Sequence, residues 1–343
     1  MIPLILGSFA FTFLATRWLL RPGNPLTAVD EPNHRSLHAQ RTPKGGGLAI
    51  VAVLVLLEVQ QRLAGAALFP NAWPLMGFIA IAVVSFLDDR RPIPSGVRLI
   101  VHLLAAAALL VGGLRFETLP LPGLLEQPLA LGFLAIPLTL GFAVWFTNLY
   151  NFMDGMDGFA GGMTVFGFGG CGLLAYQNGD AALTLLCLGA AAASCGFLAW
   201  NFPPARIFMG DVAAAPLGYL VAVVTFWGVR NNTLDLWQPL LLFAPFWVDA
   251  TCTLIRRLVN RERVWEAHRT HAYQRFAQAG WGHRGTTLAE YACMALMVVA
   301  AWWFGGLGPQ PRLFLLLGVA VLFILAWLML RSVERAHRNR GTE

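Results

Sequence analysis

The chain has 343 residues, of which 57% are hydrophobic and only 12% are charged, and its mean hydropathy is +0.62. Soluble domains usually carry about 25% charged residues, so this composition excludes an ordinary soluble protein. The net charge of +6 requires no nucleic-acid partner, because a biased membrane topology accounts for it. The polar segments are too short to fold separately, which predicts one integral membrane domain over 1–343 with a basic cytoplasmic tail at 331–343.

Apolar stretches long enough to cross a bilayer as helices recur along the whole chain. Lipid cannot hydrogen-bond the backbone, so these stretches must be helical. We therefore expect an all-α polytopic membrane protein with about eleven transmembrane helices, placed at 1–20, 46–63, 73–87, 99–114, 129–147, 160–177, 181–199, 212–229, 236–258, 287–304 and 313–330.

An odd number of spans puts the two termini on opposite sides of the membrane. The positive-inside rule favours an N-terminus outside and a C-terminus in the cytoplasm. With that orientation, few of the 24 Lys and Arg residues lie outside, namely Arg62, Arg115, Arg230 and Arg312.

Five polar segments rich in Asp, Asn, His, Arg and Gly would all lie on the cytoplasmic side, at 30–47, 88–98, 148–162, 201–211 and 256–284. A transporter would instead place polar groups near the midplane of several helices. The one-sided distribution indicates a cytoplasmic active site on a membrane scaffold. It disfavours a flippase or transporter, the main alternative outside the enzymes.

The segment at 148–162 carries an oxygen-bearing side chain at every third residue: Asn148, Asn151, Asp154 and Asp157. On a helix, this spacing would place all four within half the circumference. Gly155 is expected to loosen the helix near a ligand. The pattern favours a ligand site, with helix capping as the alternative.

Two further segments supply carboxylates. Asp88 and Asp89 end one predicted span, and their side chains would point about 100° apart on a helix, so that one could face the reaction while the other orients it. Asp211 stands at a predicted helix start, where it could cap the helix or bind a hard cation such as Mg²⁺.

The segment at 256–284 contains His268, Arg269 and His271. Zinc is unsupported, because no third ligand lies close by. A basic segment at a membrane surface can hold anionic lipid, and grouped Arg and His can equally clamp a phosphate. The residues alone leave both interpretations open.

Asp249 is the one acidic residue placed well within a predicted span. Thr253, Arg256 and Arg257 would share its helix face, and Pro245 is expected to kink the helix. The pattern allows a buried structural pair or a functional carboxylate.

In this order, the motifs D-x-P-N-x-R-x-x-H…GGG, DD…RL, N-x-x-N-x-x-D-G-x-D-G, P-P-A-R-I-F-M-G-D and H-R-x-H-A-Y-Q-R resemble those of the polyprenyl-phosphate N-acetylhexosamine-1-phosphate transferases. That family includes MraY-, WecA- and WbpL-type enzymes. The resemblance runs from about Asp30 to Arg284, and the last motif looks most like the O-antigen-initiating, WbpL-type branch.

The resemblance implies a role for each matching residue. Asn151 and Asp211 would bind Mg²⁺, with Mn²⁺ as an alternative, and Asp157 would read the uracil ring. The expected catalytic group is Asp88, Asp89, Asp154 and His268, and the expected substrate-binding group is Asp157, Asn148, Arg98, Arg269, His271, Arg206 and Lys44. Within these groups, Arg98 would meet the acceptor phosphate and Arg269 the donor diphosphate.

The implied reaction transfers an N-acetylhexosamine-1-phosphate, with a 6-deoxy sugar as one candidate, from a UDP-sugar to undecaprenyl phosphate in the bacterial inner membrane. UMP would be released, and a lipid-linked glycan such as an O-antigen would be started. Direct attack by the acceptor phosphate is favoured over a covalent Asp intermediate. A CDP-alcohol-type phosphotransferase is the alternative enzyme, and a homodimer is compatible with the sequence.

Two positions depart from the family pattern. Ala213-Ala214 stand where Gly-Ser is usual, beside the expected metal ligand, and His102 stands where Gln is frequent.

Overall fold

The computed structural model describes residues 1–32, 41–263 and 268–340. Its helices are α1 (Ile2–Leu19), α2 (Leu48–Leu63), α3 (Ala72–Asp88), α4 (Ser95–Val111), α5 (Ala135–Met153), α6 (Phe159–Gln177), α7 (Ala181–Asn201), α8 (Asp211–Arg230), α9 (Trp237–Leu242), α10 (Ala244–Val259), α11 (Ala272–Phe276), η2 (Ala277–Trp281), α12 (Gly282–Gly306) and α13 (Pro309–Arg340). Short hairpins pair β1 (Ala28–Asp30) with β2 (Thr42–Lys44), and β3 (Thr118–Leu119) with β4 (Leu129–Ala130).

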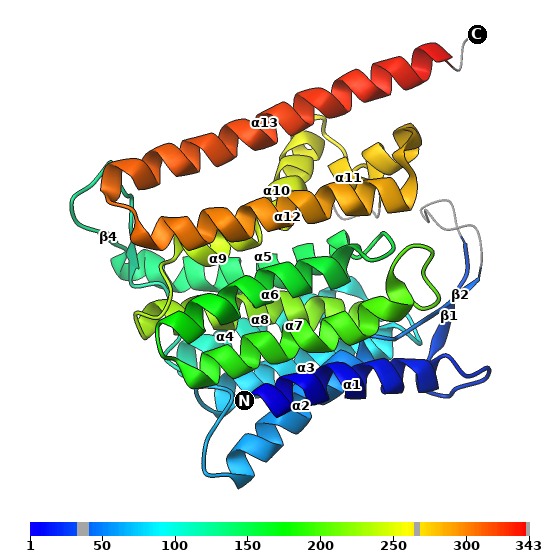
Figure 1. Ribbon diagram of the computed structural model, residues 1–343, viewed down its shortest axis with the longest axis horizontal. Helices are drawn as coiled ribbons and strands as arrows, with labels where there is room; N and C mark the ends of the chain where they lie inside the picture. The colour runs from blue at the N-terminus through cyan, green and yellow to red at the C-terminus, as the bar shows by residue number, and fades with distance from the viewer. Residues whose placement is uncertain (33–40, 264–267, 341–343) are drawn as a thin grey trace.

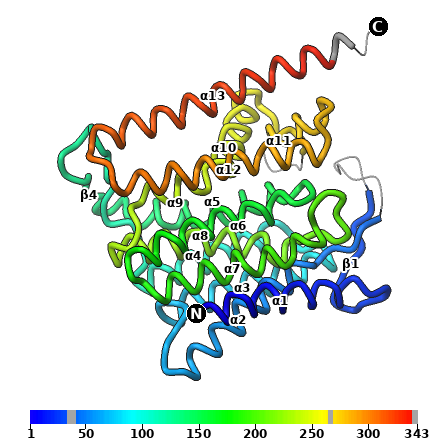
Figure 2. The backbone as a smooth tube through the Cα atoms, viewed as in Figure 1, coloured from blue at the N-terminus to red at the C-terminus, as the bar shows by residue number. Residues whose placement is uncertain are grey.

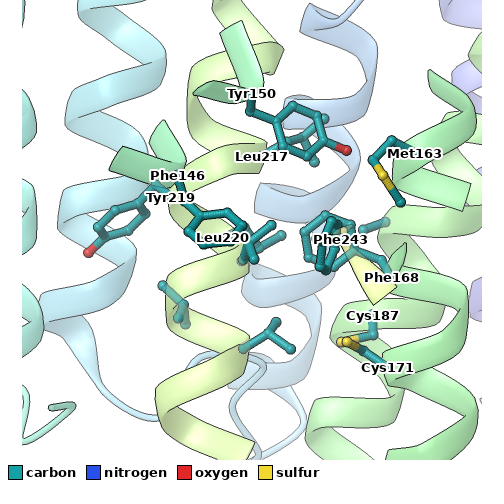
Figure 3. Packing of buried hydrophobic residues seen from close by; sticks show 14 of the residues in the cluster. Phe146, Tyr150, Met163, Phe168, Cys171, Cys187, Leu217, Tyr219, Leu220 and Phe243 are labelled. Atoms are coloured by element: carbon teal, nitrogen blue, oxygen red, sulfur yellow. The ribbon is translucent and has the colours of Figure 1, made fainter. Parts of the chain in front are cut away.

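Helix α8 forms the centre of the bundle, and 94% of its most apolar stretch is buried. It is apolar on every side, which is typical of a helix surrounded by others. Figure 3 shows its Leu217 and Leu220 among aromatic side chains of neighbouring helices. A Cβ built on Gly218 would lie 2.2 Å from the carbonyl oxygen of Phe146, so glycine permits the close packing of α8 on α5.

The periphery is apolar but exposed. The most apolar stretch of helix α13 has a mean hydropathy of 3.0, yet only 6% of it is buried, and Figure 1 shows the helix along one side of the bundle. Such a surface suits contact with lipid. Within the described residues, seven helices are long and apolar enough to cross a membrane, and α3 and α4 are shorter apolar helices.

Each expected span overlaps a helix, but several boundaries were wrong. Helix α13, expected at 313–330, runs from Pro309 to Arg340, so residues 331–340 of the expected tail are helical. The stretch expected at 129–147 begins as β4, and its helix α5 runs from Ala135 to Met153. Asn148 and Asn151 remain helical because they face polar partners rather than lipid. The stretch expected at 236–258 is broken at Phe243 into α9 and α10, and Pro245 stands in the first turn of α10, where its missing N–H costs no helical hydrogen bond. The eleven-span count and the orientation stay predictions.

The bundle has two polar ends. In Figures 1 and 2, the β1–β2 hairpin and α11 lie at the end toward which α1 and α13 run. The segments ending α3 and α5 and those starting α4, α6, α8 and α12 meet at this same end, which we call the site end. Asn33, Arg35 and His38 of the first motif lie outside the described residues.

Candidate active site

The polar segment at 30–47 reaches the site end by pairing with the polar segment at 201–211. Phe208 N–H donates to the carbonyl oxygen of Pro43 at 2.8 Å, and the N–H groups of Gly45 and Gly46 donate to that of Phe208. A Cβ on Gly47 would lie 2.3 Å from that of Ala213. The triple glycine therefore serves close packing, and it brings Lys44 to the start of α8.

Asp89 holds the N-terminus of α8. Its carboxylate accepts hydrogen bonds from Asp211 N–H at 3.2 Å and Val212 N–H at 3.0 Å, and it pairs with the Lys44 ammonium at 3.1 Å. The first N–H groups of a helix lack helical partners, and a carboxylate also suits the helix dipole. Gly210 has φ +80°, and a Cβ there would lie 2.7 Å from Asp89 Oδ2, so only glycine fits this contact.

Because Asp89 caps the start of α8, the Asp211 side chain does not cap this helix. Its side chain is directed elsewhere: Oδ2 accepts from Asn151 Nδ2 at 3.0 Å and lies 3.4 Å from Arg98 Nη1. The same Arg98 nitrogen lies 2.6 Å from Asp88 Oδ2. The capping alternative raised for Asp211 is wrong, because Asp89 performs that function.

Asp154 completes a carboxylate cluster, which we define as Asp88, Asp89, Asp154 and Asp211 with Asn151, Arg98 and Lys44. Asp154 follows the last residue of α5 and lies close to the backbone of Gly210. Burial and the neighbouring Asp211 and Asp89 raise the pKa of Asp154 well above its usual value.

Lys44 responds to the same charges. Burial disfavours its ammonium form, but the carboxylates of Asp89 and Asp211 outweigh this effect and raise the pKa of Lys44. The cluster therefore combines an excess of carboxylate with two fixed cations, Lys44 and Arg98, which is a suitable environment for a metal ion and phosphates.

Asp157 is buried and makes protein contacts. Oδ2 accepts from Ala205 N–H at 3.0 Å, and Oδ1 lies 3.1 Å from Nδ1 of His283 at the start of α12. Beside it, the Asn201 side chain accepts from Gly158 N–H at 3.0 Å and donates to the Ile207 carbonyl at 2.8 Å. These contacts join α6, α12 and the 201–211 segment, and they leave the role of Asp157 in reading uracil a prediction.

Asn148 lies one turn before Asn151. Its side chain donates to the Val144 carbonyl at 2.7 Å and lies near His102. His102 is buried on α4, one turn beyond Arg98. Asn148 therefore lies close to the carboxylate cluster, but its side-chain nitrogen already donates a hydrogen bond to the protein backbone.

The polar segment at 256–284 is held against the bundle by hydrogen bonds to Asp249 of α10. Its carboxylate accepts from the N–H groups of Ala272 at 2.8 Å and Tyr273 at 3.1 Å, and from Thr253 Oγ1 at 3.0 Å. His271 Nδ1 lies 3.5 Å away. Asp249 therefore anchors α11. Thr253 was one of the three residues expected on the same helix face as Asp249, and it is the one that binds this carboxylate.

The two arginines expected beside Asp249 bind other groups instead. Arg256 Nη2 donates to the Thr270 carbonyl at 2.8 Å, and Arg257 pairs with Glu262 at 2.9 Å. Arg256 thereby holds the loop that precedes α11.

Helix α11 packs on the turn between α5 and α6. Tyr273 is fully buried, packs against Phe159 with the two rings tilted and their centroids 4.6 Å apart, and donates to the Phe152 carbonyl at 3.3 Å. A Cβ on Gly155 would lie 2.3 Å from the Tyr273 hydroxyl oxygen. The third and fifth motifs are therefore one structural unit.

The remaining expected residues lie at the edge of the site end. His268 packs on the ring of His271, with centroids 4.8 Å apart, and burial together with His271 and nearby arginines lowers the pKa of His268 to about 4. Arg269 and Arg206 are exposed, and Arg206 lies over the Trp200 ring. Among the residues that the structure describes, no contact joins His268, Arg269 or Arg206 to the carboxylate cluster.

Sequence reasoning missed three contacts: Asp89 with the start of α8, Asp249 with the start of α11, and His283 with Asp157. His283 lies within the polar segment 256–284, and that position was the only signal for it. The other two join residues far apart in the chain, which no local pattern indicates.

The sequence has relatives of assigned activity. A family model described as glycosyl transferase family 4 matches residues 72–229, which contain all four carboxylates of the cluster. A probable undecaprenyl-phosphate N-acetylglucosaminyl 1-phosphate transferase from Bacillus subtilis (strain 168) is 30% identical, over 80% of this chain and 76% of its own length.

Two further relatives match at 27% identity. An undecaprenyl-phosphate alpha-N-acetylglucosaminyl 1-phosphate transferase from Yersinia pestis aligns over 98% of this chain and 92% of its own length. A decaprenyl-phosphate N-acetylglucosaminephosphotransferase from Mycobacterium leprae (strain TN) aligns over 84% and 80%.

Proposed function

Because the chain belongs to glycosyl transferase family 4 and is a polyprenyl-phosphate N-acetylhexosamine-1-phosphate transferase, we propose that it transfers N-acetylhexosamine-1-phosphate from a UDP-sugar to undecaprenyl phosphate at the carboxylate cluster. The observation that carries the proposal is the arrangement of Asp211, Asn151 and Asp88 around Arg98 at the start of the buried helix α8. It supplies anionic ligands and a phosphate-binding cation side by side.

UDP-N-acetylglucosamine is the first donor to test, because the relatives reported above are named for N-acetylglucosamine. A 6-deoxy-N-acetylhexosamine and a place in the O-antigen branch are narrower proposals, and they rest on the H-R-x-H-A-Y-Q-R motif alone.

The residues of the cluster fit a magnesium ion. Mg²⁺ usually takes one or two carboxylates and keeps water and substrate phosphates as its other ligands. Asp211 and Asn151 provide one carboxylate and one amide, and among the described residues no closed set of three His, Cys, Asp or Glu ligands competes with them. When bound, Mg²⁺ would neutralise charge on the donor diphosphate; Mn²⁺ is the alternative ion.

The protein's own groups would bring two anions together. Arg98 is proposed to bind the acceptor phosphate, and its position at the cluster supports this role, since its Nη1 lies 2.6 Å from Asp88 Oδ2. An acceptor oxygen would attack the phosphorus that carries the sugar, and the bond from that phosphorus to the UMP oxygen would break. Arg269 is proposed to hold the donor diphosphate and Asp157 the uracil.

Direct attack is supported over a covalent aspartyl route. Asp89 is occupied by Lys44 and two backbone N–H groups. Asp88 accepts from Arg98 and from Ile93 N–H at 2.6 Å. Both carboxylates are therefore held as orienting groups, whereas a phosphate oxygen needs only positioning and charge neutralisation.

The activity test uses purified protein in detergent with undecaprenyl phosphate, Mg²⁺ and a panel of UDP-sugars. We expect UMP release that requires the acceptor and occurs with UDP-N-acetylhexosamines but not with UDP-glucose. Release that is independent of the acceptor, or absent with every N-acetylated donor, would refute the proposal.

A further inference from the structure

Helix α13 contacts the bundle mainly near its two ends. At the end opposite the site end, which we call the outer end, Arg312 pairs with Asp235 at 3.2 Å. At the site end, α13 packs on α11 and η2. Between these contacts, its apolar side chains are exposed, including Val321, Ile324 and Leu328. The placement of α13 against the site end therefore depends on the contacts with α11 and η2.

One site-end contact is a bidentate ion pair between α11 and α13. Arg275 Nε lies 2.8 Å from Glu334 Oε1, and Arg275 Nη2 lies 2.7 Å from Glu334 Oε2. The side chains are only 18% and 24% exposed. Parallel N–H···O bonds of this kind fix orientation as well as distance, and partial burial makes the pair stronger than an exposed one.

Helix α11 needs such a support. It has five residues, far too few to be stable alone, so its orientation comes from tertiary contacts. Asp249 fixes its first N–H groups and Tyr273 fixes its inner face. Arg275 fixes the opposite end, through Glu334.

The loop at 268–271, whose side chains are expected to bind phosphate, is hydrogen-bonded to the segment that follows α11. Gln278, just after α11, donates to the backbone carbonyl of Arg269 at 3.1 Å, and also to that of Gln274 at 3.0 Å. Arg256 holds the Thr270 carbonyl at 2.8 Å. A displacement of α11 would therefore displace the backbone of Arg269.

We propose that Glu334 is a positioning residue: by binding Arg275 it holds α11, and with it the His268–His271 loop, in the orientation that the donor requires. The C-terminal helix α13 would then be part of the catalytic apparatus as well as a membrane anchor. This inference rests on the proposed function for the donor-binding role of the loop.

The test compares Glu334→Gln with Asp235→Asn. Both substitutions remove a charge pair that joins α13 to the bundle, but Asp235 lies at the outer end. We expect Glu334→Gln to raise the donor KM about tenfold or more, since small displacements of positioning groups have effects of this size. Asp235→Asn should leave the donor KM within about twofold of the parent. The charge-exchanged pair Arg275→Glu with Glu334→Arg should recover most of the loss.

A second readout does not depend on activity. Hydrogen exchange of the intact protein should show faster exchange in the peptide 268–276 for Glu334→Gln and not for Asp235→Asn. Equal exchange and equal donor KM in the two variants would overturn the proposal, as would failure of the exchanged pair to restore either quantity. If the parent protein shows no activity but Glu334→Gln still speeds exchange in the peptide 268–276, the proposed function is refuted and the positioning role is supported.

Discussion

At the scale of single residues, the two carboxylates that meet at the start of α8 have different functions. Asp89 accepts the backbone N–H groups of Asp211 and Val212, whereas the Asp211 side chain is directed at Asn151 and Arg98. One therefore stabilises the helix terminus, and the other is available to a cation. Their proximity in space was not evident from the sequence, because they lie 122 residues apart.

This division predicts opposite effects of the two alanine variants. Asp211→Ala should lower kcat about 100-fold or more by weakening metal binding, with little change in thermal stability. Asp89→Ala should destabilise the protein by about 1–2 kcal/mol, as the loss of a helix cap does. UMP release at increasing Mg²⁺, together with thermal unfolding in detergent, measures both. Near-normal activity of Asp211→Ala at saturating Mg²⁺ would contradict the ligand role.

Arg269 offers a second residue-scale prediction, because its side chain is exposed and so is that of Arg261. The planar fork of Arg269 can bind two phosphate oxygens, which Lys cannot reproduce. Arg269→Lys should therefore lose about tenfold or more in kcat/KM for the donor, while Arg261→Lys should be nearly silent. Equal rates for the parent and both variants would assign Arg269 to lipid binding rather than to the donor.

At the scale of helices and loops, hydropathy located the helices well, because lipid leaves the backbone no alternative. It failed where polar residues extend a helix into the site, as at Asn148 and Asn151, and where Pro245 opens a new helix. The site motifs indicated which residues matter, but not that Tyr273 joins the fifth motif to the third. Such contacts depend on the tertiary packing, which local spacing does not encode.

The junction between α11 and the α5–α6 turn gives an element-scale prediction. Gly155→Ala would place a Cβ 2.3 Å from the Tyr273 hydroxyl, whereas Gly141→Ala on α5 meets no atom within 4 Å. The first change should displace α11 and reduce activity about tenfold or more, and the second should be tolerated. If the two variants have the same activity and the same melting temperature, the junction is not required for turnover.

At the scale of the whole molecule, the polar segments are separated in the sequence but, in the part of the chain that the structure describes, they meet at one end of the helix bundle. That end would face the cytoplasm by the positive-inside rule. A reporter enzyme fused to the C-terminus should therefore be active only if it functions in the cytoplasm, and one fused in the 178–180 loop only if it functions outside. The reverse pattern would move the site to the other face of the membrane.

The central claim is that a phosphorus atom moves together with the sugar. The most direct measurement supplies UDP-N-acetylglucosamine radiolabelled at the β-phosphorus, with undecaprenyl phosphate, to the parent protein and to Asp211→Ala. We expect the parent to transfer one label to the lipid phase for each UMP released, and Asp211→Ala to transfer almost none. Label that remains in water as UDP while the sugar enters the lipid would contradict it, because the reaction would then be a simple glycosyl transfer.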